Sequence, residues 1–185
     1  MLHSHLLNAS QTALVVIDVQ EAFRSVIPEF ATVASRISTA VRGFQLLGVP
    51  VLVTEQYPKG LGPTAEEIKF VLQEDEEPFE KTAFSSCGAA PFVARLEELQ
   101  IKQVVICGLE THICVNQTAH DLLDRGFQVH ILTDCVCSRF EYNKAAGLAK
   151  MQQSGVIASS VEMALFELMR DSKNEHFKEI QQLIK

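Results

Sequence analysis

The chain has 185 residues, of which 47% are hydrophobic and 21% are charged, and its formal net charge is −7 at pH 7. This length suits one well-buried core, so we expect a single domain over residues 1–185. The acidic balance argues against nucleic acid or an anionic membrane surface as the main partner, because both require a basic face on the protein.

The five cysteines are an odd number without a C-x-x-C pair, and this pattern is not a disulfide framework. They are Cys87, Cys107, Cys114, Cys135 and Cys137. The first residues carry no basic stretch followed by a long apolar one, and no apolar run has the length of a membrane span. We therefore expect a cytoplasmic protein in reducing surroundings.

The first part of the chain shows strand and helix patterns in alternation. Residues 13–18 are an aliphatic run that ends in an aspartate, as is typical of a buried parallel strand. Residues 29–47 have apolar side chains at helical spacing and stop before a glycine, which favours a helix. Residues 50–55 predict a second strand, and the glycine- and proline-rich residues 56–63 predict a loop that could cover a site.

The next part of the chain is less regular. Thr64 is a possible cap for a short helix, and the acidic run over residues 74–77 is interpreted as a solvated turn without a function. Residues 78–84 predict a short strand with Lys81 near its end. A helix over residues 89–99 follows.

The second half of the chain repeats the alternation of strand and helix. The predicted elements are a strand over 103–107, a helix over 112–124, a strand over 127–132, a helix over 141–153, a strand over 156–158, a helix from 160 onward and a helical tail over 175–185. Regular alternation with short apolar strands predicts an α/β fold with a mostly parallel sheet and right-handed crossovers.

Residues 104–115 form an apolar run that breaks at a glycine and continues with a helical pattern. Cys114 would lie one turn into a helix that follows a buried strand. Unpaired backbone N–H groups and the helix dipole favour a thiolate at such a place, so Cys114 is the candidate nucleophile. The alternative is an inert packing role, because free cysteines are among the most buried residues. Cys107, Cys135 and Cys137 are interpreted without chemistry, the last two near the rim of the site after the fifth strand.

Three chemically complementary residues fall at or just past the carboxyl ends of predicted strands: Asp18, Lys81 and Cys114. Ligands of open α/β sheets bind beyond these ends, so the three side chains could meet at one rim. The carboxylate can take the thiol proton, the ammonium can stabilise the thiolate, and the protonated acid can protonate a leaving amine. Singly, Asp18 could cap a loop and Lys81 could lie on the surface, so the combination carries the prediction.

Three motifs, LVVIDVQ at 14–20, FEKTAFS at 79–85 and GLETHICV at 108–115, resemble in order and spacing those of the isochorismatase-like, or cysteine hydrolase, superfamily. The resemblance covers nearly the whole chain. It implies a three-layer α/β/α sandwich around a six-stranded, mostly parallel sheet. Glu110 and His112 resemble the branch of isochorismatase domain-containing proteins.

The resemblance implies that Asp18, Lys81 and Cys114 form the catalytic triad. It also implies a cis peptide bond at Leu109–Glu110 and an oxyanion hole formed by the backbone N–H groups of Glu110 and Cys114. The residues expected to line the substrate pocket are Gln20, Phe23, Tyr57, Phe84, Thr111 and His112.

Two departures from the superfamily's patterns narrow the expected activity. Metal-binding nicotinamidases carry an Asp-x-His pair after the second strand, whereas this chain has EQYPKG at residues 55–60, so we expect no catalytic metal and no cofactor. Relatives that hydrolyse isochorismate itself lack the nucleophilic cysteine. Because Cys114 is present, we expect hydrolysis of an amide or related C–N bond in a small molecule through an acyl-enzyme.

Two other function classes stay open from the sequence. The chain could be a homo-oligomeric binding module that keeps the triad without substantial turnover. A nuclease or nucleic-acid binder is a third hypothesis, which the acidic balance disfavours. Because members of the superfamily assemble into dimers or larger rings, we expect a homo-oligomer.

Overall fold

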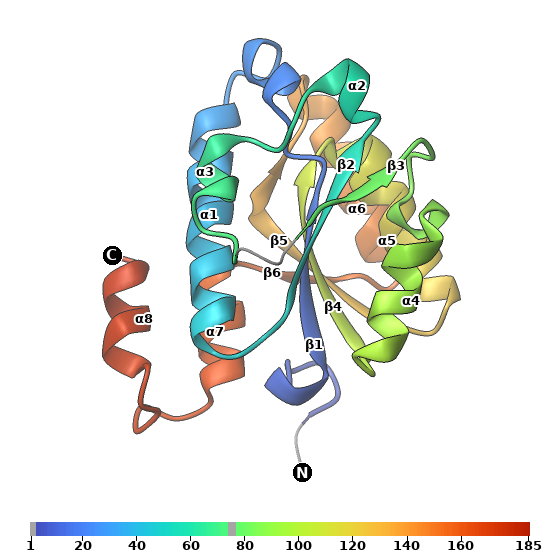
Figure 1. Ribbon diagram of the computed structural model, residues 1–185. Helices are drawn as coiled ribbons and strands as arrows, with labels where there is room; N and C mark the ends of the chain where they lie inside the picture. Colours follow the sequence, from blue (N-terminus) through green and yellow to red (C-terminus); the bar gives the residue numbers. More distant parts are fainter. Residues whose placement is uncertain (1–2, 74–76) are drawn as a thin grey trace.

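The structure, a computed structural model, describes residues 3–73 and 77–185. It has the three-layer α/β/α architecture that the family resemblance implies, with helices on both faces of one sheet (Figure 1). Within the described residues the sheet has six strands in the order β3-β2-β1-β4-β5-β6, and every neighbouring pair is parallel. The interpretation of the acidic run falls largely on residues 74–76, which lie outside the described residues.

The elements follow the predicted alternation closely. The strands are β1 (Thr12–Ile17), β2 (Val51–Gln56), β3 (Phe79–Lys81), β4 (Gln103–Leu109), β5 (Gln128–Cys137) and β6 (Ile157–Ser159). The helices are α1 (Phe30–Leu46), α2 (Pro58–Leu61), α3 (Glu66–Lys69), α4 (Ala90–Glu98), α5 (Asn116–Asp124), α6 (Glu141–Gln153), α7 (Val161–Met169) and α8 (Phe177–Leu183), and the shorter turns are η1 (Ala9–Gln11), η2 (Glu21–Ser25), η3 (Ser86–Gly88) and the π-helical η4 (Thr111–Val115).

Strand β1 is buried on both faces of the sheet because helices cover both. Its side chains alternate between two cores, with Leu14 and Val16 facing one and Val15 and Ile17 facing the other. Helices α1, α3 and α7 lie over the first face, with α8 on the outer side of α1, and α4, α5 and α6 lie over the second (Figure 1). Continuous apolar runs in the sequence therefore become strands with no polar face.

The strand order reverses between β1 and β4, where the chain has crossed to the other half of the sheet. At this switch point Gly108 of β4 pairs with Ile17 of β1. Gly108 has a φ of 121°, and a Cβ built there would lie 2.0 Å from the Ile17 carbonyl oxygen. Only glycine allows this close approach of the two strands.

Strand β5 is longer than predicted, and this corrects the placement of two cysteines. The predicted end at residue 132 is wrong, so Cys135 and Cys137 lie inside β5 and are buried. The strand continues through a shift of register against β4, since Ile106 pairs with Ile131 but Gly108 pairs with Val136. Within this stretch the Asp134 carboxylate accepts a hydrogen bond from the N–H of Val161, 3.2 Å away at the start of α7. A polar residue that resembles a strand end thus finds its hydrogen-bond partner at the start of a helix.

The segment after β2 also differs from its prediction. The predicted loop over 56–63 contains the short helix α2. Thr64 does not cap a helix: its hydroxyl donates to Oε1 of Glu55 at 2.6 Å, and α3 begins after Ala65. Among helices of the described residues, none is long and apolar enough to cross a bilayer.

Candidate active site

Asp18 lies directly after β1, in the left-handed region with a φ of 52°, and is fully buried. Its backbone N–H donates to the carbonyl of Thr54 at 3.1 Å, so the residue stays attached to the neighbouring strand β2. Oδ1 accepts from the Thr54 hydroxyl at 2.8 Å, and Oδ2 lies 2.6 Å from Nζ of Lys81. Both carboxylate oxygens therefore have a strong donor inside the protein.

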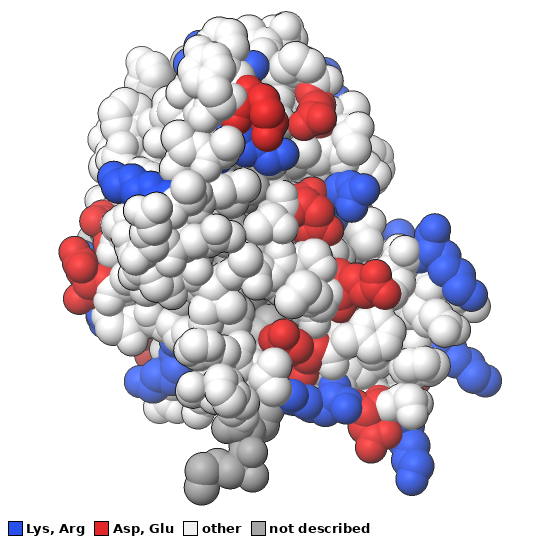
Figure 2. All heavy atoms as spheres, turned by 180° about the vertical axis from the view of Figure 1, so that it is seen from behind, with Lys and Arg blue, Asp and Glu red and all other residues white. Residues whose placement is uncertain are grey.

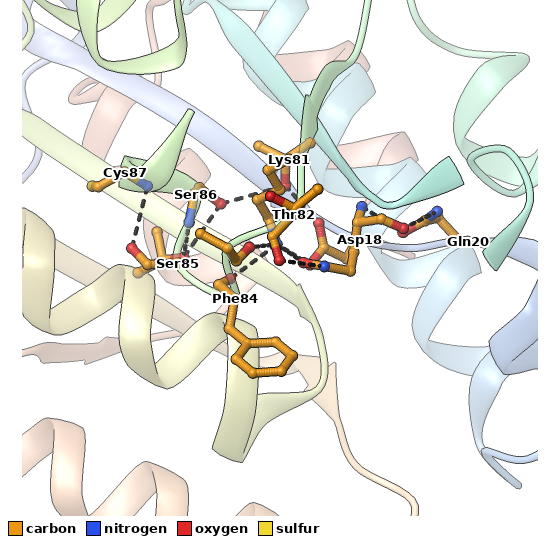
Figure 3. A network of polar contacts seen from close by, with 12 residues as sticks. Asp18, Gln20, Lys81, Thr82, Phe84, Ser85, Ser86 and Cys87 are labelled. Carbon is orange, nitrogen blue, oxygen red and sulfur yellow. Dashed lines mark hydrogen bonds and ion pairs between the residues drawn. The ribbon is translucent and has the colours of Figure 1, made fainter. Parts of the chain in front are cut away.

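Lys81 is the last residue of β3, and its ammonium is buried. Besides Asp18, Nζ lies 2.8 Å from Oε1 of Gln56 and within 3.2 Å of the carbonyl oxygens of Ala83 and Phe84. Four acceptors share its three protons, so the ammonium has no proton to spare for a ligand. Lys81 therefore acts as a fixed positive charge beside Asp18 (Figure 3).

Cys114 lies in η4, between the end of β4 and the start of α5, and is 7% exposed. Its thiol interacts with both Asp18 and Lys81. The structure thus brings together the three side chains that the sequence places at strand ends, from residues as far apart in the chain as 18 and 114. The topological switch between β1 and β4 makes this possible, because their carboxyl ends meet at one rim.

The resting thiol differs from the sequence-based expectation of a thiolate. Burial, followed by the negative charge of Asp18, raises the pKa of Cys114 to about 12, and Lys81 offsets only part of this. The helix dipole acts only within the first turn and is outweighed by the lost hydration. Burial also raises the pKa of Asp18, against the lowering effect of Lys81. The site therefore holds a protonated thiol beside a carboxylate that is more basic than usual.

The turn before Cys114 is held by its neighbours. The peptide bond between Leu109 and Glu110 is cis, at the position to which the resemblance assigns one. The buried Glu110 carboxylate accepts from the backbone N–H of Arg139 at 2.9 Å and from its Nε at 3.1 Å. His112 makes a 3.0 Å hydrogen bond with the Ser138 hydroxyl. The segment after β5 thus fixes both ends of the turn.

Thr111 and Gln20, two of the predicted pocket residues, are fully buried. The Thr111 hydroxyl has no hydrogen-bond partner among the described residues. The Gln20 amide donates to the carbonyls of Gln56 and Gly62 at 3.0 and 2.7 Å, and accepts from the Gln56 N–H at 2.8 Å. Gln20 therefore anchors the segment between β2 and α3, and a substrate contact by it stays a prediction.

The aromatic residues predicted to line the pocket have different surroundings. Tyr57 and Phe84 are each 54% exposed. The Tyr57 ring lies against Gly60, and the Phe84 ring points away from the polar network around Lys81 (Figure 3). Phe23 is half-buried and packs against the core under α1. The two exposed rings are thus available to a ligand, Phe23 contributes to packing, and a substrate contact by any of the three stays a prediction.

Sequence reasoning missed several polar side chains that surround Asp18 and Lys81. Thr54 and Gln56 of β2 contact Asp18 and Lys81, respectively, and Ser86 lies 3.4 Å from the Thr54 hydroxyl. One signal could have revealed Thr54. It is a polar residue at the carboxyl end of an aliphatic strand, and it pairs in register with Ile17, next to Asp18.

The residues at the second strand do not form a metal site. The Glu55 carboxylate is bound by Thr64, and the Gln56 amide is bound to Lys81 and to the Thr82 carbonyl. In residues 3–73 and 77–185, no group of three or more His, Cys, Asp or Glu side chains has the spacing to hold a metal ion. The donor set at this position therefore does not fit a catalytic metal, and the expectation of a metal-free site stays a prediction.

Comparison with known proteins gives consistent matches over most of the chain. The profile of the isochorismatase domain matches residues 12–163. A secreted isochorismatase effector, Isc1, of Phytophthora sojae is 43% identical over 94% of this chain and 84% of its own. Isochorismatase domain-containing protein 2 of Danio rerio is 38% identical over 96% of this chain and 89% of its own.

Solved structures match the fold as well. The MAR1 ribonuclease of Caenorhabditis elegans has a TM-score of 0.87 and 39% identity, covering 97% of this chain and 92% of that one. The pyrazinamidase of Pyrococcus horikoshii in complex with zinc has a TM-score of 0.70 and 25% identity, covering 81% of this chain and 99% of that one.

Proposed function

The chain belongs to the isochorismatase family, and from this premise we propose that it is a cysteine hydrolase that cleaves an amide or related C–N bond of a small molecule. Cys114 is the nucleophile, Asp18 the proton acceptor and donor, and Lys81 the fixed charge. The observation that carries the proposal is the buried Asp18–Lys81 ion pair against the Cys114 thiol. A solved relative with 25% identity is named a pyrazinamidase, and this name supports the proposal.

The proposed reaction begins with a neutral thiol. The Cys114 sulfur attacks the carbonyl or imidate carbon while its proton passes to the Asp18 carboxylate. Because the pKa values of both groups are raised, proton transfer during the attack is favoured over a thiolate that forms beforehand. The protonated Asp18 then gives the proton to the leaving amine, and the C–N bond breaks. Water, deprotonated by Asp18, hydrolyses the thioester and restores the thiol.

Lys81 stays charged throughout this sequence. Its ammonium lies 2.6 Å from Oδ2 of Asp18 and lowers the energy of the carboxylate each time the proton leaves. The backbone N–H groups of Glu110 and Cys114 are the proposed donors to the oxyanion of the tetrahedral intermediate. One such donor typically contributes about 2.7–4 kcal/mol of transition-state stabilisation.

Beyond the reaction, we propose that residues 1–185 act as one domain within a homo-oligomer in the cytoplasm. The five cysteines are all unpaired and buried, which suits a reducing compartment. Sedimentation equilibrium of the purified protein tests the assembly.

An ammonia-release screen over a panel of small primary amides tests the activity, with the wild type compared with Cys114→Ala. We expect turnover by the wild type and none by the variant, with both proteins showing the same circular dichroism. Isothermal titration calorimetry with the same panel tests the alternative that the chain is a binding module without substantial turnover. Binding without turnover by the wild type would favour that alternative, and full activity in Cys114→Ala would remove Cys114 from its role.

A ribonuclease activity is the second candidate, because a solved relative with 39% identity is named a ribonuclease. The net charge of −7 opposes it, since phosphate binding depends on basic side chains. On the face shown in Figure 2, basic and acidic side chains are interspersed rather than gathered by sign. RNA affinity with a steep salt dependence, together with RNA cleavage that survives Cys114→Ala, would favour this candidate.

A further inference from the structure

Three buried hydroxyl groups connect Asp18 to the helix that follows Cys114. The Thr54 hydroxyl lies 2.8 Å from Oδ1 of Asp18 and 3.4 Å from Oγ of Ser86, and Ser86 Oγ lies 3.2 Å from Oγ1 of Thr118. All three residues are fully buried. They come from β2, η3 and α5, so the hydroxyls join the elements that surround the site.

The hydrogen bonds along this row of hydroxyls can run in only one direction when Asp18 is ionised. An ionised Asp18 only accepts, so Thr54 must donate its single proton to Oδ1. Ser86 must then donate to Thr54, and Thr118 must donate to Ser86. The Thr118 oxygen in turn accepts the backbone N–H of Ser86 at 2.8 Å. Every hydroxyl thus donates once and accepts once, and every donated proton points toward Asp18.

We propose that Thr54, Ser86 and Thr118 are positioning residues that act in series to hold the Asp18 carboxylate as a proton acceptor toward Cys114. Successive hydrogen bonds polarise one another, so Ser86 and Thr118 strengthen the donor that Thr54 presents. With Oδ1 held by Thr54 and Oδ2 by Lys81, the carboxylate plane is fixed from both sides. Thr118 lies one helical turn after Cys114, so the row also ties the nucleophile's helix to this carboxylate.

The inference deepens the proposed function and rests on it for the direction of proton transfer. Within the described residues, the titratable and charged groups that face Asp18 are Lys81 from β3 and Cys114 from η4. Thr54 from β2 adds a neutral donor. Removing that donor therefore acts on Asp18 without changing the charge of the site.

The first experiment replaces Thr54 with valine, which keeps the shape of the side chain and removes its donor. The titration of the Asp18 carboxyl is followed by ¹³C NMR, with its signal identified by loss in Asp18→Asn. We expect the midpoint to rise by about one pH unit in Thr54→Val, because a hydrogen bond that stabilises the carboxylate is lost. Thr54→Ser, which keeps the hydroxyl, should restore the wild-type midpoint. Thr133→Val is the matched control, since that hydroxyl on β5 donates to the Ser159 carbonyl at 3.0 Å and should leave the midpoint unchanged.

The second experiment tests whether the hydroxyls act in series. Ser86→Ala should raise the midpoint by less than Thr54→Val, and should add nothing in the Thr54→Val background. An unmoved midpoint in Thr54→Val, or an equal Ser86→Ala effect in both backgrounds, would overturn the proposal. The titration needs no substrate, so a protein with shifted midpoints but no turnover would contradict the proposed hydrolase and leave the hydroxyl row intact. Turnover with unmoved midpoints would contradict the role of the hydroxyl row and leave the proposed hydrolase intact.

Discussion

Nζ of Lys81 lies 2.6 Å from Oδ2 of Asp18, and neither side chain is exposed to solvent. A buried charge is tolerated when its partner is present and becomes costly when that partner is removed. The pair therefore couples the stability of the fold to the integrity of the site.

Lys81→Met should lower the free energy of unfolding by about 3–5 kcal/mol, because it leaves Asp18 buried without a counter-charge. The double variant Asp18→Asn/Lys81→Met should recover much of that loss, since no charge is then left unpaired. Urea denaturation measures both. The exposed Arg95–Glu98 pair, at 2.7 Å, is the control, and Arg95→Met should change stability by less than about 1 kcal/mol. Equal losses in the single and double variants would contradict the coupling.

The pH dependence of Cys114 alkylation should reveal the role of Asp18. With burial raising the pKa of the thiol to about 12, few thiolates exist at neutral pH without help. Iodoacetamide should still react at a rate that is flat across neutral pH, because the proton can pass to the ionised Asp18. In Asp18→Asn the plateau should vanish, and the rate should rise about tenfold per pH unit as the thiolate fraction grows. The same profile in both proteins would remove Asp18 as the base.

Selective alkylation tests whether the reactivity of a cysteine depends on its neighbouring side chains or on its solvent exposure. Cys87 and Cys114 have nearly equal exposure, at 8% and 7%, and burial raises the pKa of both thiols. Only Cys114 has the Asp18–Lys81 pair beside it, so limiting iodoacetamide at neutral pH should label Cys114 first. Peptide mass spectrometry gives the order. Labelling of Cys87 at the same rate would mean that exposure alone controls reactivity.

Gly108→Ala should destabilise the protein by at least about 4 kcal/mol, because the new Cβ would lie 2.0 Å from the Ile17 carbonyl oxygen. Gly48→Ala is the matched control. Gly48 also has a positive φ, of 68°, but nothing lies within 4 Å of the position of its Cβ, so the cost should be about 1–2 kcal/mol. Thermal and urea unfolding of the two variants compare them, and equal losses would contradict a steric role for Gly108.

The sequence predicts the framework of the site because strand ends are visible in it. Asp18 and Cys114 follow apolar runs, Lys81 lies near the end of a shorter predicted strand, and the rule that parallel strands share one binding rim brings the three together. The family resemblance assigns the same three residues independently. The mostly parallel sheet follows from the alternation of runs, and the family resemblance implies its six strands and three layers.

The polar contacts that hold the side chains of the site cannot be predicted from the sequence in the same way. Thr54 and Ser86 are 32 residues apart, and their meeting depends on how the loop after β3 folds over the sheet. The sequence predicts that Gln20 lines the pocket, and residue type alone does not reveal that its amide also binds the backbone carbonyls of Gln56 and Gly62. The raised pKa of Cys114 follows from burial, which a sequence motif does not report.

The pairing of β1 with β4 joins residues 91 positions apart, and the ion pair joins residues 63 positions apart. Contacts so distant along the chain form slowly, because a long loop must close before they contribute any stability. We therefore expect the arrangement of Asp18, Lys81 and Cys114 to form late in folding, with the closing of the sheet rather than with hydrophobic collapse. During refolding, the return of Asp18-assisted alkylation at Cys114 would report when the native topology forms. Global spectroscopic signals are dominated by the helices and do not report this step.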